Sequence, residues 1–149
     1  MSATDQIFFR TELDPEAAAR AIADALGCEF EKSDRGVFLG RDKVGGLTDY
    51  FAGQVSVNYL GDPDNPPGER SAIDDYPLVW AVHKKGGYDP DQQLRGARAL
   101  AGEMIEKLAW PLLLVHELEI AVLAWSPEDG LIEFPADTSV DAEQFSGAP

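Results

Sequence analysis

The sequence is poor in cysteine and has no long apolar run. A single cysteine, Cys28, among 149 residues excludes an internal disulfide and a multi-cysteine zinc site. The N-terminal residues MSATDQIFF contain neither a basic start nor a long apolar segment, and the longest apolar run, Leu108 to Val115, is too short to cross a bilayer. We therefore expect a soluble, untargeted protein with no membrane partner, and the cysteine usage favours a cytoplasmic location.

Catalytic motifs are missing as well. The sequence has no nucleophile-elbow serine, no dinucleotide fingerprint and no HExxH pair, and Lys43-Val44-Gly45-Gly46 lacks the residue order of a phosphate-binding loop. The two histidines, His83 and His116, fall on predicted strands among apolar neighbours, which is typical of hydrogen-bonded structural histidines. Cys28 is expected to be buried and inert. We predict no catalytic residue and no cofactor, and interpret the protein as a non-enzyme.

A metal site receives little support from the acidic residues. Asp62-Pro63-Asp64-Asn65 begins like a calcium-binding loop, but Pro66 and Pro67 replace the next ligand and the glycine that turns such a loop. A solvated surface loop explains the remaining carboxylates of this region better than a bound cation does. We therefore predict no metal.

Basic residues are scarce relative to acidic ones. Twelve Lys and Arg residues oppose 27 Asp and Glu residues, which gives a formal net charge of -15 and a pI of about 4.3. Such a charge repels nucleic acid and anionic membranes, and it speeds the encounter with a basic partner. Solubility, or a generally acidic proteome, would explain the same charge without a partner. Lys107 is the last basic residue, so the C-terminal part is purely anionic.

Apolar patterning predicts a sheet. The region from Leu112 to Phe134 is expected to form two long strands and a short third, because Pro111 blocks helix continuation and Pro127 to Gly130 supplies a turn. Ser33 to Gly36 is a turn sequence and predicts a hairpin. The other expected strands are Gln6 to Leu13, Cys28 to Lys32, Val37 to Arg41, Gln54 to Leu60 and Pro77 to Lys85.

Two helices carry clear start signals. Asp14-Pro15 and Asp89-Pro90 each combine a capping carboxylate with proline at the first helical position. The first helix is expected to end at Leu26, before Gly27, and the second to end at Trp110-Pro111.

This order of elements predicts an α+β fold: a mainly antiparallel sheet of six to eight strands with two helices packed on one face. We assign residues 1–135 to a single domain, whose folding should bury about 70% of the unfolded surface. Residues 136–149 are small, polar and acidic, and are expected to form a disordered tail. Gly61 to Asp75 is expected to be a long surface loop, either functional or mobile.

The second face of such a sheet is too apolar for plain solvent. If the helices cover the face that carries Trp80, Val57 and Leu114, then the opposite face carries Phe8, Val79, Ala81, His83, Leu113 and Val115. Sheet curling, coverage by the 42–53 or 61–75 loop, or a homodimer would each explain this composition. A docking face for a partner is the functional alternative.

Several segments together carry a family resemblance. They are PEAAARAIADALG after the opening strand, the alternating residues from Gln54 to Leu60, the strand before the second helix, LLLVHELEIAVLAW, and GLIEF. With these features the chain resembles small bacterial immunity proteins of the polymorphic toxin type, particularly the small α+β immunity proteins of contact-dependent systems.

The resemblance implies that the protein binds and neutralises a toxin made by the same cell, often a nuclease with a basic groove. Carboxylates would then occupy phosphate sites or block the groove, and aromatic residues would anchor the contact. From expected exposure, the partner-binding candidates are Asp62, Asp64, Asp74, Asp75, Glu117 and Glu119, with Tyr50 and Tyr76 as anchors. The expected partner is a basic protein, either a cognate toxin or an effector, bound by a monomer or a homodimer.

Two other functions remain open at this stage. Some secretion chaperones are small acidic α+β dimers that hold an effector segment, and this function would explain an apolar second face. A small enzyme that acts on a cationic substrate is the third alternative.

Overall fold

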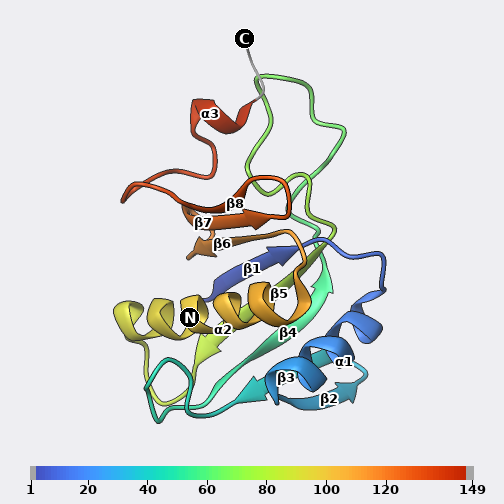
Figure 1. Cartoon of the computed structure of the whole chain (residues 1–149), viewed down its shortest axis with the longest axis vertical. Coiled ribbons are helices and arrows are strands. Elements are labelled where there is room, and N and C mark those ends of the chain that lie inside the picture. The colour runs from blue at the N-terminus through green and yellow to red at the C-terminus, as the bar shows by residue number, and fades with distance from the viewer. Residues whose placement is uncertain (1–2, 147–149) are drawn as a thin grey trace.

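The structure, a computed structural model, describes residues 3–146, and these form one eight-stranded antiparallel sheet with three helices (Figure 1). Across the sheet the strand order is β2-β3-β4-β5-β1-β6-β7-β8. The strands are β1 (Asp5–Phe9), β2 (Glu29–Ser33), β3 (Gly36–Arg41), β4 (Phe51–Val57), β5 (Leu78–Lys84), β6 (Leu112–His116), β7 (Ile120–Ser126) and β8 (Gly130–Glu133). The helices are α1 (Pro15–Leu26), α2 (Pro90–Leu108) and α3 (Glu143–Ser146). The predicted α+β class is confirmed.

The two long helices begin where the sequence predicts. Asp14 caps α1 by accepting a first-turn backbone N–H at 2.8 Å, and Asp89 caps α2 in the same way at 3.1 Å. Gly27 ends α1 in the left-handed conformation, with φ of 71°. Helix α2 ends slightly earlier than expected, because Ala109 already adopts a left-handed conformation.

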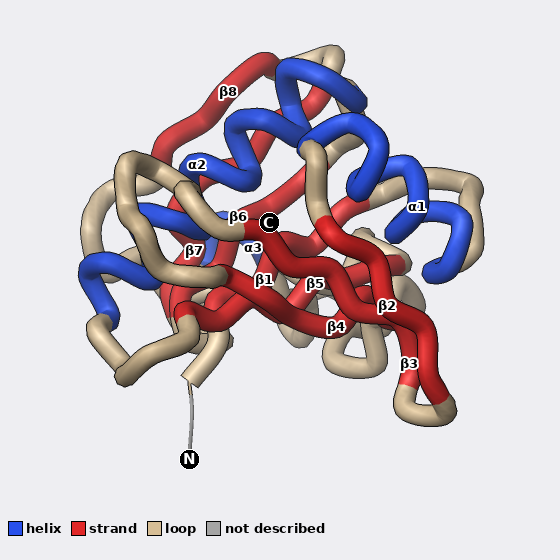
Figure 2. The backbone as a smooth tube through the Cα atoms, turned by 90° about the horizontal axis from the view of Figure 1, so that it is seen from below, coloured by secondary structure: helices blue, strands red, loops and turns tan. Residues whose placement is uncertain are grey.

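Helices α1 and α2 lie on the same side of the sheet and enclose the larger core (Figure 2). Trp80 is fully buried there, and its indole N–H donates to the carbonyl of Gly53 at 3.2 Å. Phe9 stacks on Trp110 with ring centroids 5.5 Å apart. Burial of a large apolar side chain contributes about 1.5–3 kcal/mol, so this layer accounts for much of the stability of the fold. Its largest fully buried members include Ile7, Phe9, Ile22, Phe51, Trp80, Leu100, Met104, Leu112 and Leu114.

Two segments that are distant in sequence cover part of the opposite sheet face. We call residues 61–77 and 136–146 together the acidic cap. The cap packs on a second, smaller cluster that contains Phe8, Val79, Leu113, Val115, Ile73, Tyr76, Val140 and Phe145. Backbone hydrogen bonds join its two segments: Ala72 donates to Val140 and Gly68 to Ser146, both at 2.9 Å. The 61–75 loop therefore covers the sheet residues of this cluster, which is one of the explanations given above for the apolar second face.

The C-terminal segment is packed rather than disordered as far as Ser146. Ser139 forms a bridge to Ile120 of β7, Val140 is buried, and the ring of Phe145 meets that of Phe134 edge-on at 5.3 Å. The acidic composition led to the wrong expectation here, because two apolar side chains are enough to dock the segment on the second cluster. Residues 147–149 of the predicted tail lie outside the described part of the chain.

Strand β4 ends earlier than the alternating pattern predicts. The backbone N–H of Asn58 donates to Pro77, and its side-chain amide donates to the carbonyls of Ile73 and Tyr76 at 3.0 and 2.8 Å. These bonds hold the chain against the cap. Val57, expected on the helix-covered face, is consequently exposed, and the side chain of Tyr59 is 85% exposed.

Candidate functional site

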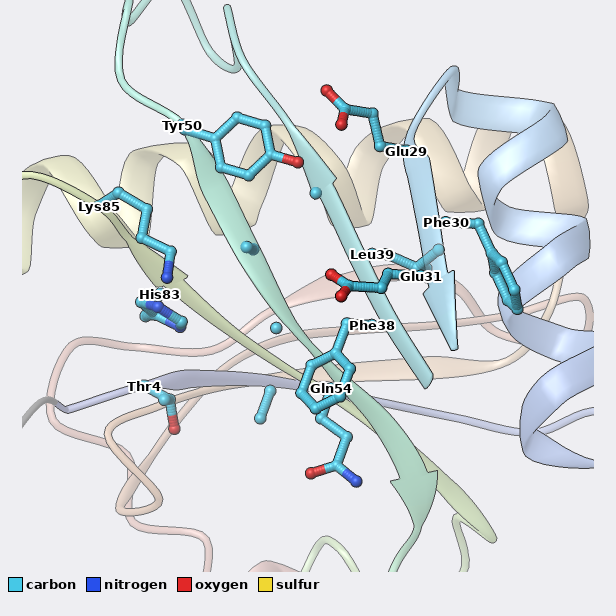
Figure 3. A pocket seen from close by; sticks show the side chains of 14 residues that line it. Thr4, Glu29, Phe30, Glu31, Phe38, Leu39, Tyr50, Gln54, His83 and Lys85 are labelled. Atoms are coloured by element: carbon cyan, nitrogen blue, oxygen red, sulfur yellow. The ribbon is translucent and has the colours of Figure 1, made fainter. Parts of the chain in front are cut away.

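One part of the second sheet face stays open. Over part of β2 to β5, outside the patch that the acidic cap covers, the sheet surface forms a pocket of about 540 Å³ (Figure 3). We call this pocket the trough. The side chains that define it are Glu29, Glu31, Phe38, Tyr50, His83 and Lys85.

Strand register explains why the surface is hollow. The pairs Glu29 with Gly40, Gly40 with Ala52, and Ala52 with His83 place these four residues in one line across four strands. Because cross-strand partners point to the same face, the line has charged or polar side chains at its two ends and only glycine and alanine between them. The floor of the trough is therefore low.

The ring of Tyr50 lies over Gly40. A Cβ atom added to Gly40 would lie 2.1 Å from the Tyr50 hydroxyl oxygen, so only glycine leaves room for this ring position. The backbone carbonyl of Tyr50 accepts the N–H of Lys85 at 2.8 Å, which ties the tyrosine to the end of β5. Tyr50 and Phe38 thus give the trough two aromatic side chains (Figure 3).

The charged groups of the trough are separated by sign. Glu29 and Glu31 come from β2, whereas His83 and Lys85 come from the other side of the pocket (Figure 3). Within residues 3–146, none of these four side chains forms a hydrogen bond or an ion pair, and neither does the Tyr50 hydroxyl. The pocket therefore presents several polar groups whose hydrogen-bonding capacity is free for a ligand.

Burial and the neighbouring charges adjust the protonation of two of these groups. Burial raises the pKa of Tyr50, and the negative charge of Glu29, among other nearby groups, raises it further. Burial lowers the pKa of His83, and the positive charge of Lys85 lowers it further. At neutral pH Tyr50 is accordingly a neutral phenol and His83 a neutral imidazole.

The sequence-predicted partner residues lie mostly elsewhere, on and beside the acidic cap. Asp62, Asp64 and Asp75 are exposed there, and the fold places them in the same cap as the acidic C-terminal segment. The exposed carboxylates of the cap are those of Asp62, Asp64, Glu69, Asp75, Asp137, Asp141 and Glu143. Arg70 forms an ion pair with Asp75 and donates to two loop carbonyls, so it compensates one of these seven carboxylates.

Asp74 differs from the other predicted residues because it is buried, with 3% of the residue exposed. One carboxylate oxygen accepts the N–H of Asp62 at 3.0 Å, and the other accepts the N–H of Ser71 at 2.7 Å and the amide of Asn65 at 3.2 Å. Burial alone would raise the pKa of Asp74, but these donors outweigh it and lower the pKa. The expected exposure of Asp74 is thus wrong, and its carboxylate organises the loop.

The remaining predicted residues are dispersed. Glu119 is exposed, and its carbonyl accepts the N–H of Val140 at the border of the cap. Glu117 lies in the preceding turn, 3.8 Å from His116 Nε2. Tyr76 is half-buried beneath Arg10, whose guanidinium carbon lies 5.6 Å from the ring centroid. Tyr50 lies in the trough, so the two predicted anchors do not share a surface.

The two histidines have different roles in the fold. His116 Nδ1 lies 2.7 Å from a carboxylate oxygen of Asp5, which is fully buried. Burial raises the pKa of Asp5, although the interaction with His116 opposes this rise. His116 is therefore a hydrogen-bonded structural histidine, as expected, whereas His83 makes no such bond with a described residue. Cys28 is half-buried, and burial raises its pKa to about 11, which fits an inert thiol.

Most of the negative charge has no internal compensation. Within residues 3–146, ion pairs join seven of the twelve Lys and Arg side chains to five of the 27 Asp and Glu carboxylates. In the described part of the chain, no group of three or more His, Cys, Asp or Glu side chains could hold a metal ion, and no helix is both long and apolar enough to cross a membrane.

Comparisons with protein-family models, with curated proteins and with solved structures find no match to this chain. Function is therefore inferred from the chemistry of the trough and the acidic cap.

Sequence reasoning singled out Tyr50 and placed Ala81 and His83 on the second sheet face, but it did not bring them together with the other residues of the trough. The alternation of Glu29 and Glu31 around Phe30 indicates that the two carboxylates share a face. No local signal, however, shows that this face continues across Gly40 and Ala52 to His83, because that line depends on the register of three strand pairs.

Proposed function

We propose that the protein is a non-catalytic binding protein for a basic protein partner, of the kind expected of an immunity protein that neutralises a toxin, and that the acidic cap is its docking surface. The observation that carries this proposal is the meeting of two acidic segments in one cap. The exposed carboxylates of residues 61–77 adjoin those of residues 136–146. A basic surface, such as the phosphate-binding groove of a nuclease, would be complementary to them.

The hydrogen bonds that hold the cap together support the same function. Loop 61–77 is held by Asp74, by Asn58 and by its hydrogen bonds to the C-terminal segment. Exposed carboxylates on an ordered surface lose less conformational entropy on binding than those on a disordered tail. They also steer the encounter, so association should be fast and should slow as salt increases.

The dimeric-chaperone alternative is weakened by the cap. One argument for that hypothesis is that it explains an apolar second face, but the chain itself covers Phe8, Val79, Leu113 and Val115.

The proposal is tested by co-expressing the chain with the product of the adjacent reading frame and purifying the complex. We expect a one-to-one complex that dissociates as salt is raised, and rescue of growth when the neighbouring protein is toxic. A triple variant that neutralises the cap, Asp62→Asn, Asp64→Asn and Asp141→Asn, should slow association at least tenfold.

A matched control removes the same charge elsewhere. Asp24→Asn, Asp91→Asn and Glu106→Gln neutralise three exposed carboxylates of α1 and α2. This control variant should associate almost as fast as the unmodified chain. Equal slowing by the two triple variants would show that net charge alone matters, and failure to recover any complex would refute the proposed partner.

A further inference from the structure

The trough is a surface feature separate from the acidic cap. We propose that it binds an elongated zwitterion of the basic amino acid class, with the cationic head at Glu29 and Glu31 and the carboxylate at Lys85 and His83. This inference goes beyond the proposed function, because it concerns a different surface and a small ligand group.

The unused polar groups of the trough are the first reason. Two carboxylates, one ammonium group, one neutral imidazole and the Tyr50 hydroxyl converge on a pocket of about 540 Å³, and none has a hydrogen-bond or ion-pair partner within residues 3–146. Ligand pockets typically combine apolar walls with a few convergent polar groups. The aromatic side chains of Tyr50 and Phe38 supply the apolar part.

The separation of the charges selects an elongated ligand. Strands β2 and β5 are three strand spacings apart, which places their backbones about 14 Å from one another. Glu31 and Lys85 lean inward from the two sides and shorten this gap (Figure 3). The arginine side chain separates its guanidinium from the α-carboxylate by six bonds, or about 7 Å. With a hydrogen bond of about 3 Å at each end, such a molecule reaches both sets of charges.

Ligands with a single charge fit the trough less well. An anion would meet Lys85 but would be repelled by Glu29, by Glu31 and by the net charge of -15. A simple cation would leave Lys85 unpaired. A guanidinium, by contrast, can form charge-assisted bonds to a carboxylate while its plane lies against the Tyr50 ring, and its aliphatic stem can pack over Ala52.

The test is a titration of the full chain, followed by NMR of the backbone amides and by calorimetry at low salt. The probes are L-arginine, agmatine, which lacks the carboxylate, and L-citrulline, which lacks the cationic head. We expect L-arginine to shift the amides of β3, β4 and β5 around the trough and to bind at least tenfold more tightly than the other two. The proposal is overturned if L-arginine leaves these amides unchanged, or if agmatine or L-citrulline binds equally well.

Variants assign each end of the ligand. Glu31→Gln should weaken L-arginine binding about tenfold and remove its advantage over L-citrulline. Lys85→Gln should weaken binding similarly and remove the advantage over agmatine. Both side chains are exposed, so the fold should tolerate these changes. The control Lys43→Gln removes an exposed lysine that does not line the trough and should leave the affinity unchanged.

A change of shape tests the site without altering charge. Ala52→Leu fills the floor of the trough and should abolish binding, while the melting temperature shows whether the fold persists. An unchanged affinity in a folded Ala52→Leu variant would place the ligand elsewhere and overturn the assignment.

Free arginine and the C-terminal arginine of a polypeptide carry the same two end groups. N-acetyl-L-arginine, which lacks the α-ammonium group, represents the second source. Tighter binding of the acetylated form would assign the trough to a polypeptide terminus, and tighter binding of L-arginine would assign it to the free amino acid. The cap experiments do not depend on either result.

Discussion

Asp74 and Asp64 lie in the same acidic loop, and the structure predicts opposite consequences for neutralising them. Asp74→Asn keeps the size of the side chain but replaces one carboxylate oxygen by an NH₂ group. The carboxylate of Asp74 accepts three hydrogen bonds at 2.7 to 3.2 Å. In the variant the same three donors face a neutral amide that has one acceptor oxygen instead of two. Asp64 is exposed and its carboxylate makes no hydrogen bond with a described residue, so Asp64→Asn removes only surface charge.

The expected magnitudes follow from these contacts. A hydrogen bond to a charged group contributes about 1.5–3 kcal/mol, and an unsatisfied buried donor costs about 1–3 kcal/mol. Allowing for non-additivity, Asp74→Asn should lower the free energy of unfolding by about 3 kcal/mol, which for a chain of this size lowers the melting temperature by about 6–12 °C. Asp64→Asn should change the stability by less than about 0.5 kcal/mol.

Thermal and urea unfolding measure both variants, and hydrogen exchange locates the effect. In Asp74→Asn, amide protection should fall in residues 61–77 and in the C-terminal segment that they hold. If Asp74→Asn and Asp64→Asn melt within about 1 °C of each other, Asp74 does not organise the loop and the reasoning is wrong.

Three further predictions concern other parts of the fold. In α2, Gly96→Ala should destabilise the fold by about 1–3 kcal/mol, because the new Cβ would lie 2.2 Å from the buried ring of Phe51. Gly102→Ala meets no atom of the described residues within 4 Å and should stabilise the fold by about 0.5–1 kcal/mol. Equal effects of the two variants in urea unfolding would contradict this prediction. Burial lowers the pKa of His83 below 6.5 in the folded state, so the unfolded state binds more protons as the pH falls, and the free energy of unfolding should decrease from about pH 7 towards 5.5. The decrease should be less steep in His83→Gln. If the melting temperatures of the two proteins fall equally with pH, His83 does not cause the pH dependence. Arg41→Lys should lower the free energy of unfolding by about 1–2 kcal/mol, because Arg41 donates to both carboxylate oxygens of Glu103, at 2.8 and 2.6 Å, and lysine cannot form this paired contact. An unchanged urea unfolding curve would contradict this prediction.

Helix ends and the polarity of single strands were predictable because their signals are local. Asp14 and Gly27 bound α1 through contacts within a few residues of each. The alternation of Leu78, Trp80 and Val82 against their neighbours likewise identified the core face of β5. Strand ends were predicted less well where a distant segment intervened, as at Asn58, whose side chain binds the loop before β5.

The tertiary structure decided which surface residues lie next to each other. The sequence by itself determined the fold class, the excess of negative charge and the presence of two acidic segments, since each depends on composition or on short-range pattern. It did not determine that residues 136–146 pack beside residues 61–77, that Asp74 points inward, or that Glu29 and His83 lie at the two ends of one line across four strands. Those facts depend on strand order and register, which are set by the packing of side chains that are distant in the chain. A local sequence pattern does not show which distant segments pack together.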